Sequence, residues 1–233
     1  MKIVWEHNGA DTILYSVEYV GAYTRGENLD IALAKMDTEI ASYLKWSGQS
    51  CAGKVYYEIV QEKNSDLQIA DADSDVLFES EKEPLSLDEY NHLKELVLKS
   101  ATDFYSLYNS ISNKQESCLP ERRTFYGAVP KTAQEMYEHT KNVNTYYFAE
   151  IDIDADNDGT IYDCRKRGFE KLEKTEGFLH NAVFEGSYGE LWSLRKVMRR
   201  FLWHDRIHAK AMYRMSIKTF GDFSAENPFA FTL

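Results

Sequence analysis

The sequence predicts an α+β protein in two parts, a small strand-and-helix module over residues 1–80 and a bundle of four long helices over residues 85–222. Strand-like and helix-like segments alternate in the first part, whereas only long helical patterns follow it. The charge changes at the same place. Residues 1–85 carry seven Lys and Arg against sixteen Asp and Glu, a net charge of −9, and residues 86–233 have a net charge of −2.

Composition narrows the classes of protein that are compatible with the chain. A hydrophobic fraction of 43% and an aromatic fraction of 14% are typical of a folded, core-forming protein. The formal charge of −11 argues against nucleic acid as a partner, because binding it relies on Lys and Arg that neutralise phosphates. No apolar run is long enough to cross a bilayer and the N-terminus lacks a signal-peptide pattern, so we expect a cytoplasmic protein with no membrane partner. Cys51, Cys118 and Cys164 are odd in number and far apart, which predicts reduced thiols.

The first part contains short elements separated by turn residues. In order, we predict a strand at Ile13–Val20, a turn at Arg25-Gly26, a helix capped by Asn28 and ended by Gly48, a strand at Val55–Val60, and weaker strands at Leu67–Ile69 and Val76–Phe78. This strand–helix–strand order, with a glycine-containing turn before the helix, resembles the HicB-like antitoxin domain. Such antitoxins usually add a DNA-binding helix-turn-helix or ribbon-helix-helix, and we find neither pattern here.

The second part is predicted to contain four helices joined by loops. We predict them from Ser86 to about Ile111, from Thr132 to about Ile151, from Tyr162 to Leu179, and from Leu191 to Phe220 with Gly221 as the stop. Capping boxes begin the first two, because a Ser or Thr is followed three residues later by Glu89 and Glu135 respectively. Four long helices of this kind favour a four-helix bundle.

Three histidines stand on faces predicted to point inward. His204 and His208 are four residues apart on the last helix and therefore lie on one side of it, and His139 lies on the apolar face of the second helix. A single inward histidine is most often a neutral core residue with a hydrogen-bonded partner. Burying three together without a shared partner is costly, and one divalent metal ion is the simplest shared partner.

From Leu85 to Phe220 the chain resembles the DinB-like (DinB/YfiT) superfamily of metal-binding four-helix bundles. Members carry one metal-binding histidine on the second helix and an HxxxH pair on the last, which correspond here to His139, His204 and His208. The resemblance implies a divalent transition metal ion, most often zinc or nickel, with positions left open for water or substrate. Characterised relatives include transferases and isomerases that use a low-molecular-weight thiol such as bacillithiol, mycothiol or glutathione.

We therefore predict a metal-dependent enzyme, such as a thiol-dependent S-transferase or a hydrolase, acting on a small electrophile. The alternative is a non-catalytic protein that keeps a metal for stability, sensing or interaction. A small-molecule substrate is the expected partner, and a homodimer is compatible with either interpretation. Asp205 is the one acid on the histidine helix, and it has two interpretations: a salt bridge, at the surface or with the N-terminal module, or support of the metal ligands.

Two other motifs resemble metal sites. His204-Asp205-Arg206-Ile207-His208 is similar to the zincin HExxH, with Glu226 as a conceivable third ligand, but an aspartate is one methylene too short for the glutamate base. The segment 154–159 begins like an EF-hand calcium loop, yet Arg165 stands at the twelfth position, where a bidentate glutamate is needed. We expect a solvated acidic connection there.

The last helix is strongly basic. Residues 191–219 hold eight Lys and Arg against Asp205 alone, a net charge of +7. This charge is compatible with a solvated helix face. It also predicts that the helix docks against the acidic N-terminal module or attracts an anionic thiol or substrate.

Overall fold

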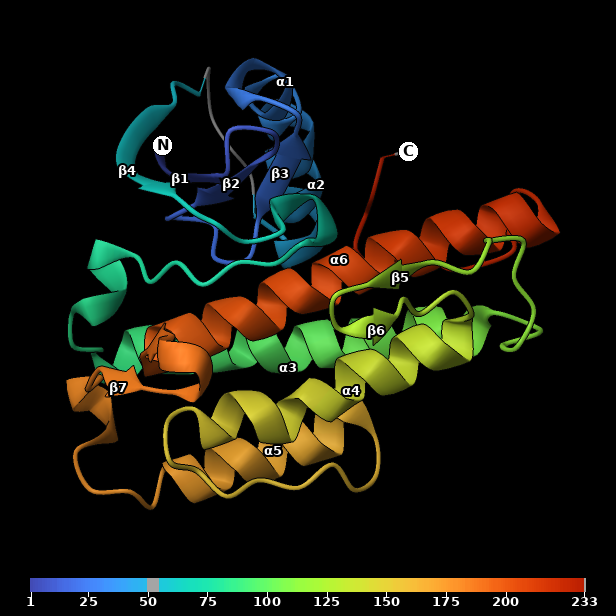
Figure 1. Ribbon diagram of the computed structural model, residues 1–233. Helices are drawn as coiled ribbons and strands as arrows, with labels where there is room; N and C mark the ends of the chain where they lie inside the picture. The colour runs from blue at the N-terminus through green and yellow to red at the C-terminus, as the bar shows by residue number, and fades with distance from the viewer. Residues whose placement is uncertain (50–54, 233) are drawn as a thin grey trace.

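The computed structural model, which describes residues 1–49 and 55–232, contains a four-stranded sheet followed by long helices, so the predicted α+β class is confirmed (Figure 1). The sheet lies above the last helix in the figure, and the other long helices lie below and behind that helix. Cys51 is outside the described residues. Cys118 is a free, exposed thiol and Cys164 a free, buried one.

The sheet combines antiparallel and parallel pairing. Its strands are β1 (Lys2–His7), β2 (Thr12–Ser16), β3 (Tyr23–Gly26) and β4 (Glu58–Asn64), in the spatial order β3-β2-β1-β4. The first three pair antiparallel, and β4 pairs parallel to β1. A parallel neighbour needs a crossover connection. Here it contains two helices, α1 (Leu29–Leu33) and α2 (Met36–Ser47).

Several predicted boundaries in this part were wrong. The strand predicted over Ile13–Val20 ends at Ser16, and the predicted turn at Arg25-Gly26 is the end of β3. The single predicted helix is divided between Leu33 and Met36, although Asn28 and Gly48 cap its ends as expected.

The later strand predictions also need correction. The strand predicted over Val55–Val60 is displaced to Glu58–Asn64. Neither weaker candidate is a strand: Ile69–Asp71 is a 3-10 helix, and Val76–Phe78 leads into a second 3-10 helix at Glu79–Lys82.

Both faces of the sheet are covered, which explains why β2 is buried along its whole length. Side chains alternate between the faces of a strand. Leu14 therefore joins the main core with the helices, whereas Ile13 and Tyr15 pack with Phe78 and with Trp203 of the last helix. The core thus continues from the sheet into the bundle. A separation into domains 1–80 and 85–222 stays a prediction.

Four long helices form the second part: α3 (Leu87–Ser110), α4 (Ala133–Ala149), α5 (Ile161–Leu172) and α6 (Leu194–Phe220). Helix α3 packs against the other three, and α4 also packs against α5 and α6. The capping boxes at Ser86 and Thr132 are confirmed. Helix α5 ends at Leu172, before the predicted Leu179, and the turn that follows it contains Gly177 with φ +72°.

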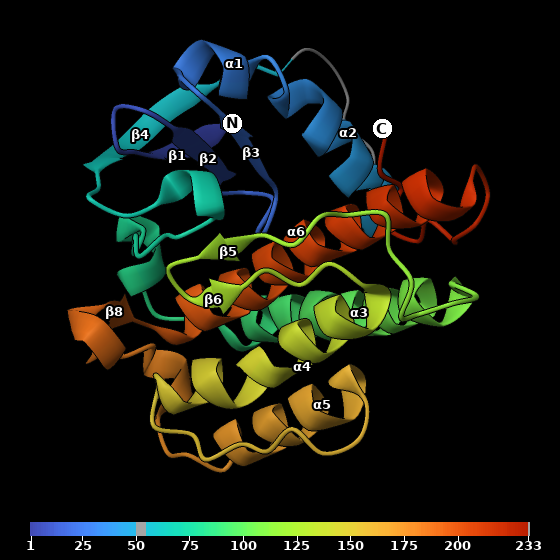
Figure 2. The ribbon, with the colours of Figure 1, turned by 45° about the vertical axis from the view of Figure 1, so that its right-hand side comes forward.

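The second part also contains short hairpins. The pair β5 (Arg123–Thr124) and β6 (Gly127–Ala128) lies over α6 and α4 in both views (Figures 1 and 2). The pair β7 (Phe184–Glu185) and β8 (Leu191–Trp192) precedes α6 together with 3-10 turns at Phe178–His180 and Ser187–Gly189. Among the helices within 1–49 and 55–232, none has both the length and the apolar character needed to cross a membrane.

Acidic side chains of the N-terminal part form buried ion pairs with the basic helix α6. Arg206 donates to Glu39 of α2 with an Nη2–Oε1 distance of 2.6 Å, and Arg199 pairs with Glu81. All four side chains are buried. The predicted docking of the two oppositely charged segments is thus confirmed. Because the pairs are buried, salt screens them less than it would screen surface pairs.

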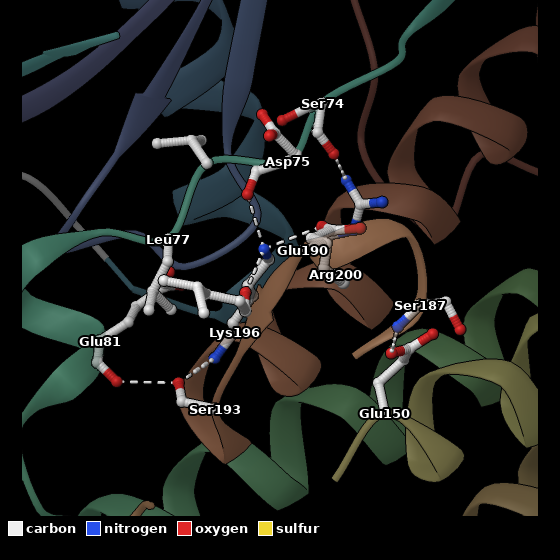
Figure 3. A network of polar contacts seen from close by, with 12 residues as sticks. Ser74, Asp75, Leu77, Glu81, Glu150, Ser187, Glu190, Ser193, Lys196 and Arg200 are labelled. Carbon is white, nitrogen blue, oxygen red and sulfur yellow. Dashed lines mark hydrogen bonds and ion pairs between the residues drawn. The ribbon is translucent and has the colours of Figure 1, made fainter. Parts of the chain in front are cut away.

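The first two turns of α6 also bind main-chain carbonyl groups of the same part (Figure 3). Lys196 Nζ donates to Asp75 O at 2.7 Å, and Arg200 Nη1 donates to Ser74 O at 2.8 Å. Lys196 also pairs with Glu190 at 2.8 Å. These contacts fix the segment before the 3-10 helix Glu79–Lys82 against the start of α6.

Gly21, between β2 and β3, packs directly against α6. Its φ is +92°, and a Cβ at this position would overlap Cβ of Leu202. We expect Gly21→Ala to lower the free energy of unfolding by about 2–4 kcal/mol, because overpacking adds to the cost of a left-handed alanine. Urea denaturation measures this loss. Gly9→Ala is the matched control, since Gly9 has φ +82° and a Cβ added there would meet no atom within 4 Å. Equal losses in the two variants would contradict a packing role for Gly21.

Candidate metal centre

The three predicted histidines come together between two helices. His139 lies two turns into α4, and His204 and His208 lie on consecutive turns of α6. Their ring centroids are 4.4 Å apart for His204 and His208, 4.6 Å for His139 and His208, and 5.0 Å for His139 and His204. One ring nitrogen from each lies within 4.8 Å of the others. The predicted juxtaposition of these residues is therefore observed.

The cluster is open on one side. His204 is only 9% exposed and His208 is half-buried, whereas His139 is exposed. The expectation that His139 points fully inward is thus only partly correct. Its ring faces the other two while remaining in contact with solvent.

Burial keeps the two α6 imidazoles neutral. Desolvation lowers the pKa of His208 to about 3, with a further contribution from His139. It also lowers the pKa of His204 well below its ordinary value, and the positive charges of neighbouring groups, Arg200 among them, act in the same direction. Desolvation lowers the pKa of His139 as well. Neutral imidazole is the form that binds metal ions.

The hydrogen bonds of the cluster leave donor and acceptor capacity unused. The only one that these rings make within the described residues joins His204 Nε2 and His139 Nε2 at 3.2 Å. His208 has no such bond there, and the buried Nδ1 of His204 lacks a partner as well. A hydrogen bond between two imidazoles can satisfy only that pair. One divalent ion accepts a nitrogen from all three, so the donor set fits a transition metal.

Asp205 has neither of the roles considered from the sequence. It is fully buried and accepts two hydrogen bonds from Arg165 of α5, both at 2.6 Å, and one from Ser100 of α3, also at 2.6 Å. It therefore joins α3, α5 and α6 and makes no contact with the histidine rings. Because Asp205 directly follows His204, it lies about 100° around the helix from the histidine side.

The other two metal-like motifs contribute no ligand to the cluster. Glu226 accepts a hydrogen bond from Ser106 on α3, so the proposed zincin ligand lies elsewhere. In the acidic loop, the guanidinium of Arg167 binds the carboxylate of Asp156 and the main-chain oxygen of Asp158. These two acceptors of the loop are therefore engaged by a cationic side chain of the same chain.

Two neighbours of the histidines were not predicted as site residues. Tyr147 packs edge-on against His204, with 6.1 Å between the ring centroids. The sequence favours a core aromatic at this position, and a wall of the site only if the ring flanks the metal. Arg200 lies one turn before His204 and is also buried. The spacing of positions 200, 204 and 208 places Arg200 on the same side of the helix as the two histidines. It was overlooked because other basic residues surround it in the sequence.

Comparison with known proteins adds no assignment to this geometry. The chain matches no family model, and it is significantly similar to neither a curated protein nor a solved structure.

Proposed function

We propose that His139, His204 and His208 bind one divalent transition metal ion, zinc or nickel, and that the chain is a metal-dependent enzyme acting on a small electrophile. The observation that carries this proposal is the convergence of three imidazoles from two helices within 4.8 Å of one another. Three protein ligands with an open position are typical of catalytic zinc sites, whereas structural sites have four. The exposure of His139 supports such an open side.

When bound, the ion supplies Lewis acidity that lowers the pKa of a water or a thiol. The histidines contribute by offering neutral nitrogens from two rigid helices, which fixes the donor geometry before binding. The reaction class in view is S-transfer from a low-molecular-weight thiol, or hydrolysis, with a small electrophile as substrate.

The distribution of donors supports a relationship to the DinB-like bundles. One histidine lies on the second helix of the bundle, α4, and the HxxxH pair lies on the last, α6. The strand–helix–strand order of the first part is likewise compatible with a HicB-like module. Both relationships are part of the proposal.

A non-catalytic metal protein is the second candidate, and one observation favours it. Within the described residues, no carboxylate or hydroxyl is hydrogen-bonded to any of the three rings. Catalytic metal ligands usually donate their second nitrogen to such a group, which orients the ring. A metal kept for stability or sensing carries out no reaction that depends on this orientation.

Metal analysis of the purified protein tests the first step. We expect about one transition metal ion per chain in the wild type and loss of most of it in His208→Ala, because two remaining imidazoles bind far more weakly. His92→Ala is the control, since His92 is an exposed histidine on α3 away from the cluster. Full metal content in His208→Ala would contradict the proposal.

Turnover separates the two candidates. The metal-loaded wild type is mixed with glutathione and 1-chloro-2,4-dinitrobenzene, and thioether formation is followed by absorbance. Activity that requires metal and is absent from His208→Ala supports the enzyme. A protein with a full metal complement that gives no rate above the uncatalysed reaction with this pair, and no hydrolysis of 4-nitrophenyl acetate, supports the binding protein.

A further inference from the structure

Arg200 is unusual among the buried arginines of α6. It is only 9% exposed, yet no carboxylate lies within ion-pair distance of it in the part of the chain that the structure describes. Its neighbours on the helix differ. Arg199 binds Glu81 and Arg206 binds Glu39, each with the edge of the guanidinium that carries Nε and Nη2.

The same edge of Arg200 is free. Its hydrogen bond within residues 1–49 and 55–232 runs from Nη1 to Ser74 O, and its buried Nε has no partner. Glu190 and Asp73 both interact with its charge, but Glu190 is paired with Lys196, and Asp73 makes no ion pair with Arg200. A buried charged donor without an acceptor is costly.

Aromatic rings surround the guanidinium without satisfying it. Its Cζ lies 4.7 Å from the ring centroid of Trp203, 5.5 Å from that of Trp192 and 5.6 Å from that of Tyr147. Cation–π contacts stabilise the charge through the ring faces. They provide no acceptor for the N–H groups in the guanidinium plane.

The position of Arg200 connects it to the histidine cluster. It stands one helical turn before His204 and two before His208, on the same side of α6. Tyr147 contacts both, with its ring beside the guanidinium and edge-on to His204. Tyr147 is thus a neighbour shared by the guanidinium and the histidine cluster.

We infer that Arg200 binds a carboxylate of the substrate or thiol co-substrate through its Nε and Nη2 donors, while the opposite end of that molecule reaches the histidine site. This inference rests on the proposed function, which it refines to small carboxylate-bearing molecules. Two parallel N–H donors match the two oxygens of a carboxylate, as the pairing of Arg199 with Glu81 illustrates in the same helix.

Two thiols that differ in one group test the inference. 3-Mercaptopropionate carries a carboxylate, and 3-mercapto-1-propanol carries a hydroxyl in its place. Binding to the Co²⁺-loaded protein is followed by the cobalt–thiolate absorption band, and binding to the metal-free protein by tryptophan fluorescence, because Trp192 and Trp203 flank the guanidinium. We expect the wild type to bind the carboxylate about 10- to 100-fold more tightly, as a charge-assisted bidentate contact predicts.

Arg200→Gln should abolish this preference while leaving cobalt content and binding of the neutral thiol unchanged. Arg200→Lys keeps the charge without the paired donors, and a reduced preference in that variant supports the inference even if Arg200→Gln fails to fold. Arg214→Gln, an exposed arginine on the same helix, is the control and should behave as the wild type.

The outcomes distinguish the two claims. A cobalt–thiolate band of equal affinity for both thiols in the wild type would overturn the role of Arg200 and leave the metal site intact. A carboxylate preference in fluorescence that Arg200→Gln removes, with no cobalt–thiolate band from either thiol, supports the role of Arg200 and counts against the metal-dependent enzyme. An unaltered preference in both Arg200 variants would overturn the inference.

Discussion

Replacing Asp205 with alanine is expected to lower the free energy of unfolding by about 3–5 kcal/mol, the usual cost of removing one partner of a buried ion pair. Asp205 and Arg165 are both fully buried, and the two oxygens of the carboxylate bind Nη1 and Nη2 of the guanidinium at 2.6 Å. The substitution leaves the charge of Arg165 in the interior against Phe201, with 4.4 Å from Cζ to the ring centroid. Denaturant unfolding followed by circular dichroism measures the change.

A double variant tests whether charge is the cause. Arg165→Met combined with Asp205→Leu removes both charges and keeps similar volumes, so it should recover most of the stability that Asp205→Ala loses. Asp205→Asn addresses the alternative role as a supporter of the metal ligands. If that variant kept its stability but lost its metal, the assignment of Asp205 to the α3–α5–α6 junction would be wrong.

Features that do not depend on tertiary structure could be predicted from local signals in the sequence. Ser86 and Thr132 begin helices because their hydroxyls and the glutamates three residues later bind backbone N–H groups of the same turn. Gly221 ends α6 for a similarly local reason. The histidine cluster was predictable because the spacing of His204 and His208 fixes their shared side, and the apolar face of α4 fixes that of His139.

The remaining features depend on contacts between distant segments. Strand β4 is mostly exposed, so its residues lack the apolar alternation that would have marked Glu58–Asn64. The role of Asp205 was not predicted, because its partner, Arg165, is 40 positions away and was considered only as the residue that breaks the calcium-loop pattern. Arg200 was one of eight basic residues in a solvated or docking face, and only the fold shows that it is buried without a carboxylate partner among the described residues.

Acid should destabilise the metal-free protein through the two imidazoles of α6. Burial places the folded-state pKa of His208 at about 3 and that of His204 well below 6.5, so between pH 6.5 and 5 the unfolded chain binds more protons than the folded one. Stability is therefore fully present above about pH 6.5 and falls as the pH decreases. At about 1.4 kcal/mol per pH unit, His208 alone costs about 2 kcal/mol by pH 5, and His204 adds to the loss in the same direction.

Glu6 acts in the opposite sense, which decides how the experiment is designed. Burial raises its pKa to about 7, so the folded state binds the extra proton between pH 7 and 4.5 and gains stability as the pH falls. The quantity to measure is thus the difference between wild type and His204→Gln or His208→Gln at each pH, in which the contribution of Glu6 cancels. His208→Gln should lose about 2 kcal/mol less than the wild type between pH 6.5 and 5, and His204→Gln should also lose less than the wild type. His92→Gln, changed at an exposed position, should follow the wild type. Parallel pH profiles for the wild type and both cluster variants would show that these imidazoles are not held neutral by burial, and the preformed neutral donor set would then have to be abandoned.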